Sequence, residues 1–493
     1  MRSFWKTLTG LTALLGAALL LAILIGLAVA AARIALYEQT EDEGRLANKR
    51  AYLEGIAASA ADSNAPAPAR PNIIVVLFDD LGYEDLSSFG ARAIRTPAID
   101  QLAAQGTSLT NYYAPAPVCT PSRASFLTGR YPVAAGLPGV AFPSDHLITR
   151  WKQIQGENIR LPADEVTVSE VLEAAGYHTG MVGKWHLGDS APSLPNDFGF
   201  NHFYGSLYSN DMPRFHLYEN RAMVEDEPDQ PELSRLYASK SLEFIDAAVA
   251  RAEPFFLYLA HHYPHIPLFA SPAHAGESAG GLYGDAVEDL DRSMAQLVQG
   301  LQQRGLADNT LILVTSDNGP WFEGSAGDVR GRKGNMFDGG QRVPFIAWWP
   351  GNIPANTSRD GVTSGVDLFP TLLELLRLPL PDDRDIHGRS MLPLLLGTEE
   401  APPRLLEFYA GSNLFAVREG RFKYHVRRPV EYNLSSTLPI SVSLPQGPWL
   451  FDLSLDRRES YDLSTTHPQE MQRFGEYVEN RNRQLKSNPR AWR

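Results

Sequence analysis

Acidic residues follow two apolar segments of this chain in the same way. Asp79 and Asp80 come directly after one segment. Asp317 and Asn318 follow the other. Adjacent Asp residues at strand ends often form turns or cap helices, so one such pair alone would indicate little. Two pairs supply hard oxygen ligands, a set that suits calcium or magnesium better than zinc.

Basic residues and histidines follow two further apolar segments. Lys184 and His186 lie just after the first of these. His261, His262 and His265 lie just after the second. Histidine is often partly buried in folded proteins for structural reasons. One histidine beside an apolar strand is therefore more often structural than catalytic. The sequence leaves open which of the three histidines points into a site.

The four apolar segments predict buried strands that would bring these residues together. The segments are short and continuous, as in strands covered on both faces, and they comprise residues 72–78, 177–183, 254–260 and 310–316. Residues 168–175 predict a short helix, and a regular apolar stripe predicts a long amphipathic helix over 287–301. In parallel α/β sheets, ligands bind beyond the carboxyl ends of the strands. We therefore expect the polar side chains to converge on one rim.

Length, charge and cysteine content exclude several classes of protein. The 493 residues, 44% of them hydrophobic, suffice for a large core and roughly two to four domains. The single cysteine, Cys119, cannot form an intrachain disulfide, which excludes a disulfide scaffold. The formal net charge of -13 argues against nucleic acid as a partner, because a nucleic-acid groove needs clustered Lys and Arg.

The amino-terminal region is long and apolar enough to cross a membrane. Residues 11–32 carry no charge and, at about 1.5 Å per residue, span a hydrocarbon core of about 30 Å. Arg2 and Lys6 precede this segment and acidic residues follow it, so residues 1–10 are predicted to be cytoplasmic. We expect a transmembrane signal-anchor with the folded body outside the cytoplasm, in the periplasm, the lumen or the extracellular space. The alternative is cleavage near residues 28–32 and secretion.

Composition and strand-like patterns divide the rest of the chain into a linker, a main domain and a smaller subdomain. Residues 33–70 are rich in Ala and Pro and are interpreted as a partly extended linker. Short strand-like runs at 414–417 and 421–426 predict an antiparallel sheet near the carboxyl end. We therefore expect a main domain over residues 71–378 and a smaller subdomain over residues 379–493.

The segment around the cysteine resembles a family signature. Residues 119–130 have the sequence CTPSRASFLTGR. This stretch is similar to the signature of the type I sulfatases, in which the cysteine of Cys-x-Pro-Ser-Arg is oxidised to formylglycine. An isolated cysteine would be taken for a small buried thiol, but the length of the match favours the resemblance. Further blocks match in order from residue 71 onward: 71–80, 173–177, 183–188, 208–212, 264–265, 316–319, 331–334 and 339–340.

The resemblance implies a fold and an activity. The fold is α/β, an alkaline-phosphatase-like α/β/α sandwich with a large mixed, mostly parallel sheet and a smaller C-terminal α+β subdomain. The activity is arylsulfatase-like hydrolysis of sulfate esters, which releases inorganic sulfate and an alcohol or phenol. Related enzymes with the same modified cysteine hydrolyse phosphate or phosphonate esters, and this is the alternative activity. A catalytically silent sulfatase-like binding protein is a further alternative from another class.

The resemblance also assigns a metal site and substrate contacts. It implies that Ca²⁺, with Mg²⁺ as the alternative, is held by Asp79, Asp80, Asp317, Asn318 and the formylglycine formed from Cys119. The implied catalytic residues are Cys119, Arg123, Lys184, His186, His265 and Lys333. The implied substrate-binding residues are Ser209, Lys184, His265 and Lys333. His265 matches the position of the acid that protonates the leaving oxygen, while His261 and His262 have no firm counterpart.

The expected partners are a sulfate-ester substrate, a formylglycine-generating enzyme and the membrane. The loops expected to set specificity, 141–160, 203–232 and 271–283, carry no pattern that identifies the sulfated compound. Aryl, sugar, steroid and alkyl sulfates all remain open at this stage. The sequence does not indicate the oligomeric state.

Overall fold

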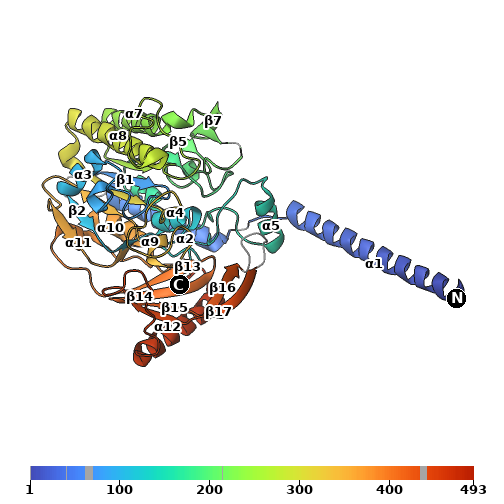
Figure 1. Ribbon diagram of the computed structural model, residues 1–493. Coiled ribbons are helices and arrows are strands. Elements are labelled where there is room, and N and C mark those ends of the chain that lie inside the picture. The colour runs from blue at the N-terminus through green and yellow to red at the C-terminus, as the bar shows by residue number, and fades with distance from the viewer. Residues whose placement is uncertain (1, 40, 62–69, 214, 434–440) are drawn as a thin grey trace.

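The structure, a computed structural model, is built around one large sheet with helices on both sides (Figure 1). It describes residues 2–39, 41–61, 70–213, 215–433 and 441–493. Parts of four predicted segments lie outside the described residues: residue 1 of the amino terminus, 40 and 62–69 of the linker, 214 of a specificity loop and 434–440 of the C-terminal subdomain.

Within the described residues, the main sheet has ten strands in the order β11-β2-β10-β9-β1-β8-β4-β5-β6-β7. Their bounds are β1 Asn72–Phe78, β2 Thr107–Leu109, β4 His178–Lys184, β5 His202–Ser206, β6 His216–Glu219, β7 Ala222–Asp226, β8 Phe255–Ala260, β9 Thr310–Ser316, β10 Phe345–Trp348 and β11 Thr357–Arg359. The central strands β9, β1, β8, β4 and β5 are all parallel. β10 is antiparallel to its neighbours β9 and β2, and β6 is antiparallel to β5 and β7. The predicted mixed, mostly parallel sheet is confirmed.

Alternating residues of β1 pack against two helical layers. Ile73 and Val75 belong to the core on one face, and Ile74 and Val76 to the core on the other. The first face is covered by α2 Glu43–Ala61, α4 Cys119–Thr128, α6 Val168–Ala174, α10 Leu368–Leu375 and α11 Leu392–Leu396. The second is covered by α3 Pro97–Ala104, α7 Leu233–Arg251 and α8 Gly281–Gln303. This arrangement is the expected α/β/α sandwich, with α7 and α8 above β1 and β2 in Figure 1.

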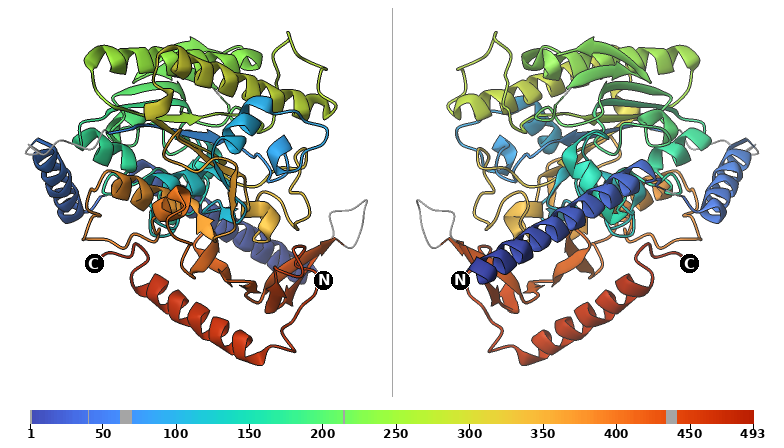
Figure 2. Two further views of the ribbon diagram at one scale, coloured as in Figure 1. Left: turned by 90° about the vertical axis from the view of Figure 1, so that its left-hand side faces the viewer. Right: turned by 90° about the vertical axis from the view of Figure 1, so that its right-hand side faces the viewer.

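A second, antiparallel sheet lies near the carboxyl end, below the main body in both views of Figure 2. Its described strands run in the order β13 Leu405–Ala410, β14 Asn413–Glu419, β15 Phe422–His425 and β18 Trp449–Asp452. Phe474 and Val478 of α12 Pro468–Ser487 share a core with Leu414 and Leu450 of this sheet. The remaining strands form two pairs, β3 Tyr112–Tyr113 with β12 Thr363–Ser364 and β16 Arg428–Asn433 with β17 Ser441–Gln446.

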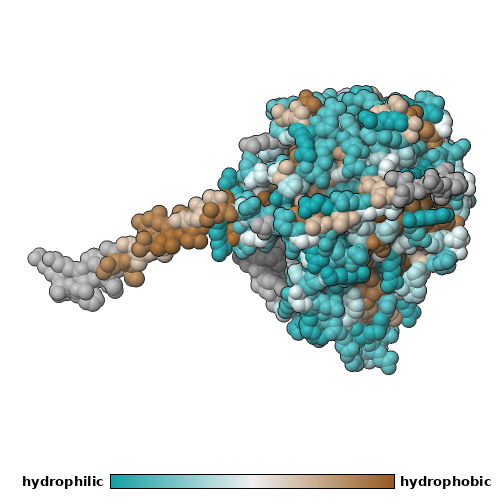
Figure 3. Space-filling view, turned by 180° about the vertical axis from the view of Figure 1, so that it is seen from behind, coloured by the Kyte–Doolittle hydropathy of each residue, from teal (hydrophilic) through white to brown (hydrophobic). Residues whose placement is uncertain are grey.

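The remaining described helices are short, apart from α1. They are α1 Arg2–Ala35, α5 Leu147–Gln155, α9 Asp338–Gln341 and the 3₁₀ turns η1 Ser87–Phe89, η2 Pro195–Asp197, η3 Gln230–Glu232, η4 Ala307–Asn309 and η5 Gly365–Asp367. α1 projects from the body as an apolar stalk (Figure 3). Residues Leu14–Ala35 form a candidate membrane span of 22 residues with mean hydropathy 2.8, and none of it is buried.

Part of the segment interpreted as a partly extended linker is helical. Residues 43–61 form α2, whose Ile56 is buried in the main core. The Lys49 ammonium lies 2.6 Å from the Glu170 carboxylate of α6 and donates a hydrogen bond to the Ala163 carbonyl oxygen. Alanine has the highest helix propensity, so this Ala-rich stretch forms a helix once one face packs on the body.

Candidate active site

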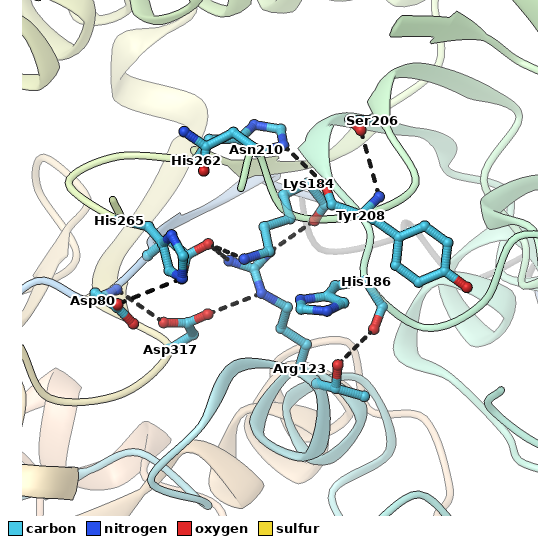
Figure 4. A network of polar contacts seen from close by, with 12 residues as sticks. Asp80, Arg123, Lys184, His186, Ser206, Tyr208, Asn210, His262, His265 and Asp317 are labelled. Atoms are coloured by element: carbon cyan, nitrogen blue, oxygen red, sulfur yellow. Dashed lines mark hydrogen bonds and ion pairs between the residues drawn. The ribbon is translucent and has the colours of Figure 1, made fainter. Parts of the chain in front are cut away.

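The carboxyl ends of four neighbouring strands meet at one rim, as predicted. Asp79 and Asp80 follow β1, and Asp317 follows β9, which pairs with β1 along its whole length. β8 lies on the other side of β1, and β4 lies beyond it. Lys184 ends β4, and His265 lies five residues after β8. Figure 4 shows Asp80, Lys184, His265 and Asp317 converging from separate elements.

Cys119 reaches the same rim from the first turn of α4. One ligand atom from each of Asp79, Asp80, Cys119 and His265 lies within 4.8 Å of the others, and all four residues are buried. Burial raises the pKa of the Cys119 thiol to about 12, although Lys184 and Lys333 lower it. The unmodified thiol is therefore protonated at neutral pH and is a poor nucleophile.

Asp80 is held by groups from three different segments. The Asn318 side-chain amide donates to Asp80 Oδ1 at 2.6 Å, and the Lys333 ammonium donates to Oδ2 at 2.8 Å. His265 Nε2 lies 3.7 Å from Oδ2. Asp80 adopts φ = 65°, a left-handed conformation that is unusual for a residue other than glycine. Residues with such backbone conformations cluster at functional sites, where the surrounding structure enforces them.

Asp79 is completely buried among cations. Its Oδ2 contacts the Lys184 ammonium and lies 3.4 Å from Arg123 Nη2. Burial alone would raise the pKa of Asp79, but Lys184, His265 and Arg123 hold it well below its usual value. The carboxyl group is therefore ionised at neutral pH, although no solvent reaches it.

Arg123 joins the two acidic strand ends. Its Nε donates to Asp317 Oδ2 at 2.9 Å, and its Nη1 donates to the Lys184 carbonyl oxygen at 2.7 Å. Burial and the charge of Asp79 raise the pKa of Asp317 to about 7, although Arg123 lowers it. The protein's own cations therefore only partly offset the repulsion between the buried carboxylates.

Two buried carboxylate or amide oxygen atoms at the rim, beyond the ends of β1 and β9, lack a hydrogen-bond donor within the described part of the chain. They are Asp79 Oδ1 and Asn318 Oδ1. Buried polar atoms in native proteins nearly always have a partner, so an unpaired oxygen in a polar cluster indicates a missing ligand. Carboxylate and amide oxygens beside two further carboxylates form the donor set that a hard divalent cation requires. The residues present therefore fit such a cation.

In the described part of the chain, the His186 ring has one backbone contact, through Nε2. Its Nε2 lies 3.1 Å from the Ala141 carbonyl oxygen, and its buried Nδ1 has no donor or acceptor within the described residues. Burial, followed by Lys184 and Arg123, holds the pKa of His186 well below its usual value. A neutral ring that donates from Nε2 leaves a lone pair on Nδ1, so Nδ1 can accept a proton.

The structure distinguishes the three histidines that follow β8. His265 contacts Asp80, whereas His262 Nδ1 lies 3.1 Å from the Tyr237 hydroxyl and its Nε2 lies 3.3 Å from the Tyr208 carbonyl oxygen. Both ring nitrogens of His261 are buried without a partner in the described chain, and burial lowers its pKa to about 3. His265 is thus the histidine that contacts the carboxylate cluster.

Two hydroxyl groups, those of Ser209 and Thr120, are also buried at the rim. Ser209 is buried and its hydroxyl has no partner among the described residues. Sequence reasoning did not single out Thr120, which occupies the variable position of the cysteine motif. Its hydroxyl donates to the His186 carbonyl oxygen at 3.0 Å and accepts from the Ala141 amide at 3.1 Å. Thr120 therefore fixes His186 and the 141 loop relative to α4.

Residues 71–378 match the family model described as Sulfatase, and residues 332–437 match the model of the N-sulphoglucosamine sulphohydrolase C-terminal region. The chain belongs to the sulfatase family. It is 37% identical over 439 residues to arylsulfatase A of Bos taurus, covering 80% of this chain and 84% of that protein. It is also 37% identical over 385 residues to the human N-acetylgalactosamine-6-sulfatase, covering 74% and 72% of the two chains.

A solved sulfatase shares the overall architecture. The crystal structure of the PsFucS1 sulfatase from Pseudoalteromonas sp. superposes with a TM-score of 0.76 at 27% identity, and the match covers 89% of this chain and 95% of that one. Together with the family match, these relatives identify this sulfatase as an enzyme that hydrolyses sulfate esters. The expected activity class is confirmed.

Proposed function

We propose that this sulfatase uses a formylglycine formed from Cys119 and a divalent cation, calcium, to hydrolyse an arylsulfatase-like range of sulfate esters. The observation that carries the proposal is the position of Cys119 inside the buried cluster of Asp79, Asp80 and His265. A thiol whose pKa is about 12 is a poor nucleophile, so a chemically modified side chain at this position accounts better for an active site.

The cation would be held by Asp79, Asp80, Asp317, Asn318 and the modified Cys119. The unpaired oxygens of Asp79 and Asn318 support this assignment. A bound calcium ion supplies positive charge that stabilises negative charge on the transferring group. With the dication, Arg123, Lys184 and Lys333 set against three carboxylates, the site carries about two net positive charges. It would attract an anionic ester although the chain as a whole is acidic.

The chain's own residues bind the sulfate and move protons. A formylglycine supplies a hydrated aldehyde, whose hydroxyl group is the nucleophile. Arg123 and Lys184 would stabilise charge beside it, and the free lone pair of His186 Nδ1 would accept its proton. His265 Nε2 would protonate the leaving oxygen. Lys333 and the unpaired hydroxyl of Ser209 would bind the sulfate.

Cysteine variants test the proposal directly. The protein would be co-expressed with a formylglycine-generating enzyme and assayed on matched sulfate and phosphonate esters of one phenol. Cys119→Ala and Cys119→Ser should fold as the parent does, by circular dichroism and thermal unfolding, yet lose sulfate-ester turnover. Ser241→Ala is a matched control, because Ser241 is another small buried side chain without a partner among the described residues.

Two outcomes would overturn the proposal. Retained turnover in Cys119→Ala or Cys119→Ser would exclude the modified residue as the nucleophile. Dominant turnover of the phosphonate ester by the parent protein would assign the chain to the alternative activity.

We also propose that α1 is a retained signal-anchor, with residues 1–10 in the cytoplasm and the body outside it. Its span of 22 residues and the charges around it support this orientation. Arg33 Nη1 donates to the Ile154 carbonyl oxygen at 2.8 Å, and the Tyr37 hydroxyl donates to the Glu157 carbonyl oxygen at 2.7 Å. Cleavage near residues 28–32 would separate these docked residues from the helix. Membrane fractionation and intact mass of the full chain test retention, and a shortened, soluble product would refute it.

A further inference from the structure

α5 exposes large apolar side chains beside the base of α1. Leu147 is 79% exposed, Ile148 42% and Trp151 60%. Positions 147 and 151 are one helical turn apart, and 148 is adjacent, so the three side chains form one apolar face. An exposed tryptophan beside two aliphatic residues is costly in water and is typical of a contact surface.

The place of α5 identifies what this face contacts. Hydrogen bonds from Arg33 and Tyr37 tie the carboxyl-terminal end of α1 to the last turn of α5 and the residues after it. A crevice of about 540 Å³ lies between the two helices, lined by the apolar residues Val29, Ala32, Leu36 and Ile154 among others. Leu36 is itself 82% exposed. Arg33, Gln153 and Gln155 line the same crevice, so the apolar surface of α1 reaches α5 through Ile154.

The length of the uncharged segment places α5 at a defined depth. Residues 11–32 extend for about 33 Å at 1.5 Å per residue, which closely matches a hydrocarbon core of about 30 Å. Arg33 follows immediately, so its guanidinium lies at the boundary between hydrocarbon and headgroups. α5, which is bonded to Arg33, lies at the same boundary. Tryptophan is enriched at this depth, because one end of its ring system is apolar and the other is polar.

We propose that α5 is a second membrane contact, lying in the interface of the bilayer that α1 spans with Leu147, Ile148 and Trp151 inserted among the lipids. The occupant of this face is a lipid surface, and the proposal rests on the retained anchor proposed above. With a single transmembrane helix the folded body could rotate relative to the membrane, whereas a second membrane contact fixes its orientation.

Hydrogen bonds between α5 and residues 140–143 connect the membrane contact to the active site. The Lys152 ammonium donates to the Val140 carbonyl oxygen at 2.6 Å, and the Thr149 hydroxyl donates to the Phe142 carbonyl oxygen at 3.0 Å. Between them lies Ala141, whose carbonyl oxygen contacts His186. The side of the active-site rim that holds His186 is therefore the side nearest the bilayer.

Spin labels on the full chain, reconstituted into phosphatidylcholine vesicles, test this placement. One label is attached at Leu147→Cys and a control label at Leu455→Cys, both in a Cys119→Ser background. Leu455 is 85% exposed and lies in the C-terminal subdomain, so it matches Leu147 in exposure. The ratio of collisions with dissolved oxygen to collisions with a water-soluble nickel complex should be several-fold higher at 147 than at 455.

The remaining outcomes each contradict the proposal in a distinct way. Chains that float with the vesicles but show a water-exposed label at 147 retain the anchor and refute the contact by α5. A label shielded from both reagents, with dipolar broadening that grows with protein density, would show that a second copy covers the face. Chains that do not float refute the anchor and this inference together.

A second measurement uses tryptophan fluorescence. Quenching of this fluorescence by brominated lipid should be smaller in Trp151→Phe than in the parent, and unchanged quenching would count against insertion.

Discussion

Two buried clusters of charge in this sulfatase differ in how completely they are paired. One is the active-site rim, and the other joins the main body to the C-terminal sheet. In the second, called here the closed cluster, the Lys423 ammonium lies 2.8 Å from Asp338 and 3.3 Å from Glu459, and His425 lies 2.6 Å from Glu459. The Tyr113 hydroxyl donates to the other oxygen of Asp338 at 2.7 Å. Each of the four carboxylate oxygens therefore has a donor.

The comparison shows what separates a structural cluster from a reactive one. Both are removed from water and both contain lysine, histidine and carboxylate. In the closed cluster every carboxylate oxygen has a donor, and the one atom of the residues named above that stays unpaired within the described chain is His425 Nδ1. At the active site, Asp79 Oδ1, Asn318 Oδ1, Ser209 Oγ and His186 Nδ1 have no partner among the described residues. Buried polar atoms left unpaired at one place indicate a binding site for a cation and an anion.

Removal of divalent cations should produce the largest difference between the two clusters. Prolonged dialysis against a strong chelator should abolish sulfate-ester turnover, and added Ca²⁺ should restore it. The thermal unfolding temperature should also fall on chelation, because a ligand that binds only the folded state stabilises it. Full activity after chelation, with metal content shown by elemental analysis to be negligible, would contradict the cation assignment.

Substitution in the closed cluster should affect stability rather than chemistry. Lys423→Met leaves Asp338 and Glu459 buried without their shared cation, and we expect a loss of about 3–5 kcal/mol in the free energy of unfolding. Activity per folded molecule should stay close to that of the parent. Arg458→Met is the control, because the pair between Arg458 and Asp328 is exposed and should contribute less than about 1 kcal/mol.

Lys184→Met, the corresponding change in the active site, should lower activity strongly and stability less. Asp79 keeps Arg123 and the proposed cation, so the loss of stability should be smaller than in Lys423→Met. Loss of a charge that stabilises the reacting group should lower kcat about 10²–10³-fold. The two variants are compared by urea denaturation and by kcat measured side by side. Equal losses of activity in both would mean that the two clusters are not separate in function.

Acid should weaken the closed cluster in a predictable range of pH. Burial alone would raise the pKa of Asp338, but Lys423, Arg418 and Arg342 lower it to about 2. A carboxyl group whose pKa is lower in the folded than in the unfolded state stabilises the protein above the unfolded value, near 3.8, and that stability is lost as the pH falls toward 2. The contribution is about 2 kcal/mol.

The measurement compares the parent with Asp338→Asn. The difference between their free energies of unfolding should be largest at pH 5–7 and shrink by about 2 kcal/mol as the pH falls from 4 toward 2. A difference that does not change with pH would show that the charge of Asp338 contributes nothing to the folded state.

The buried strands and one capped helix were predictable because their sequences leave few alternatives. Residues 72–78 and 310–316 form β1 and β9 with the predicted bounds, since continuous apolar runs require cover on both faces. The helix predicted over 168–175 forms α6, which begins at a capping box in which Thr167 and Glu170 bond to each other's backbone amides. The convergence of polar residues at one rim followed from these strands.

Other features depend on contacts that carry no signature in the sequence. The helix α2 lies within the residues interpreted as a linker, because its few apolar residues are buried only by packing on α6 and the core. The contact between Ala141 and His186 is made by a backbone oxygen, which any residue type could supply. The residue pattern alone does not distinguish the three histidines after β8, and only the family resemblance favours His265. Local patterns thus predict elements, and pairing between distant segments decides which polar atoms stay free.

The most direct test of the account is the mass of the peptide that contains Cys119 in active protein. We predict that sulfur and two hydrogen atoms are replaced by one oxygen atom at this residue, and that the modified fraction rises with specific activity across preparations. Fully active protein in which every copy of the peptide carries an unmodified cysteine would contradict the account.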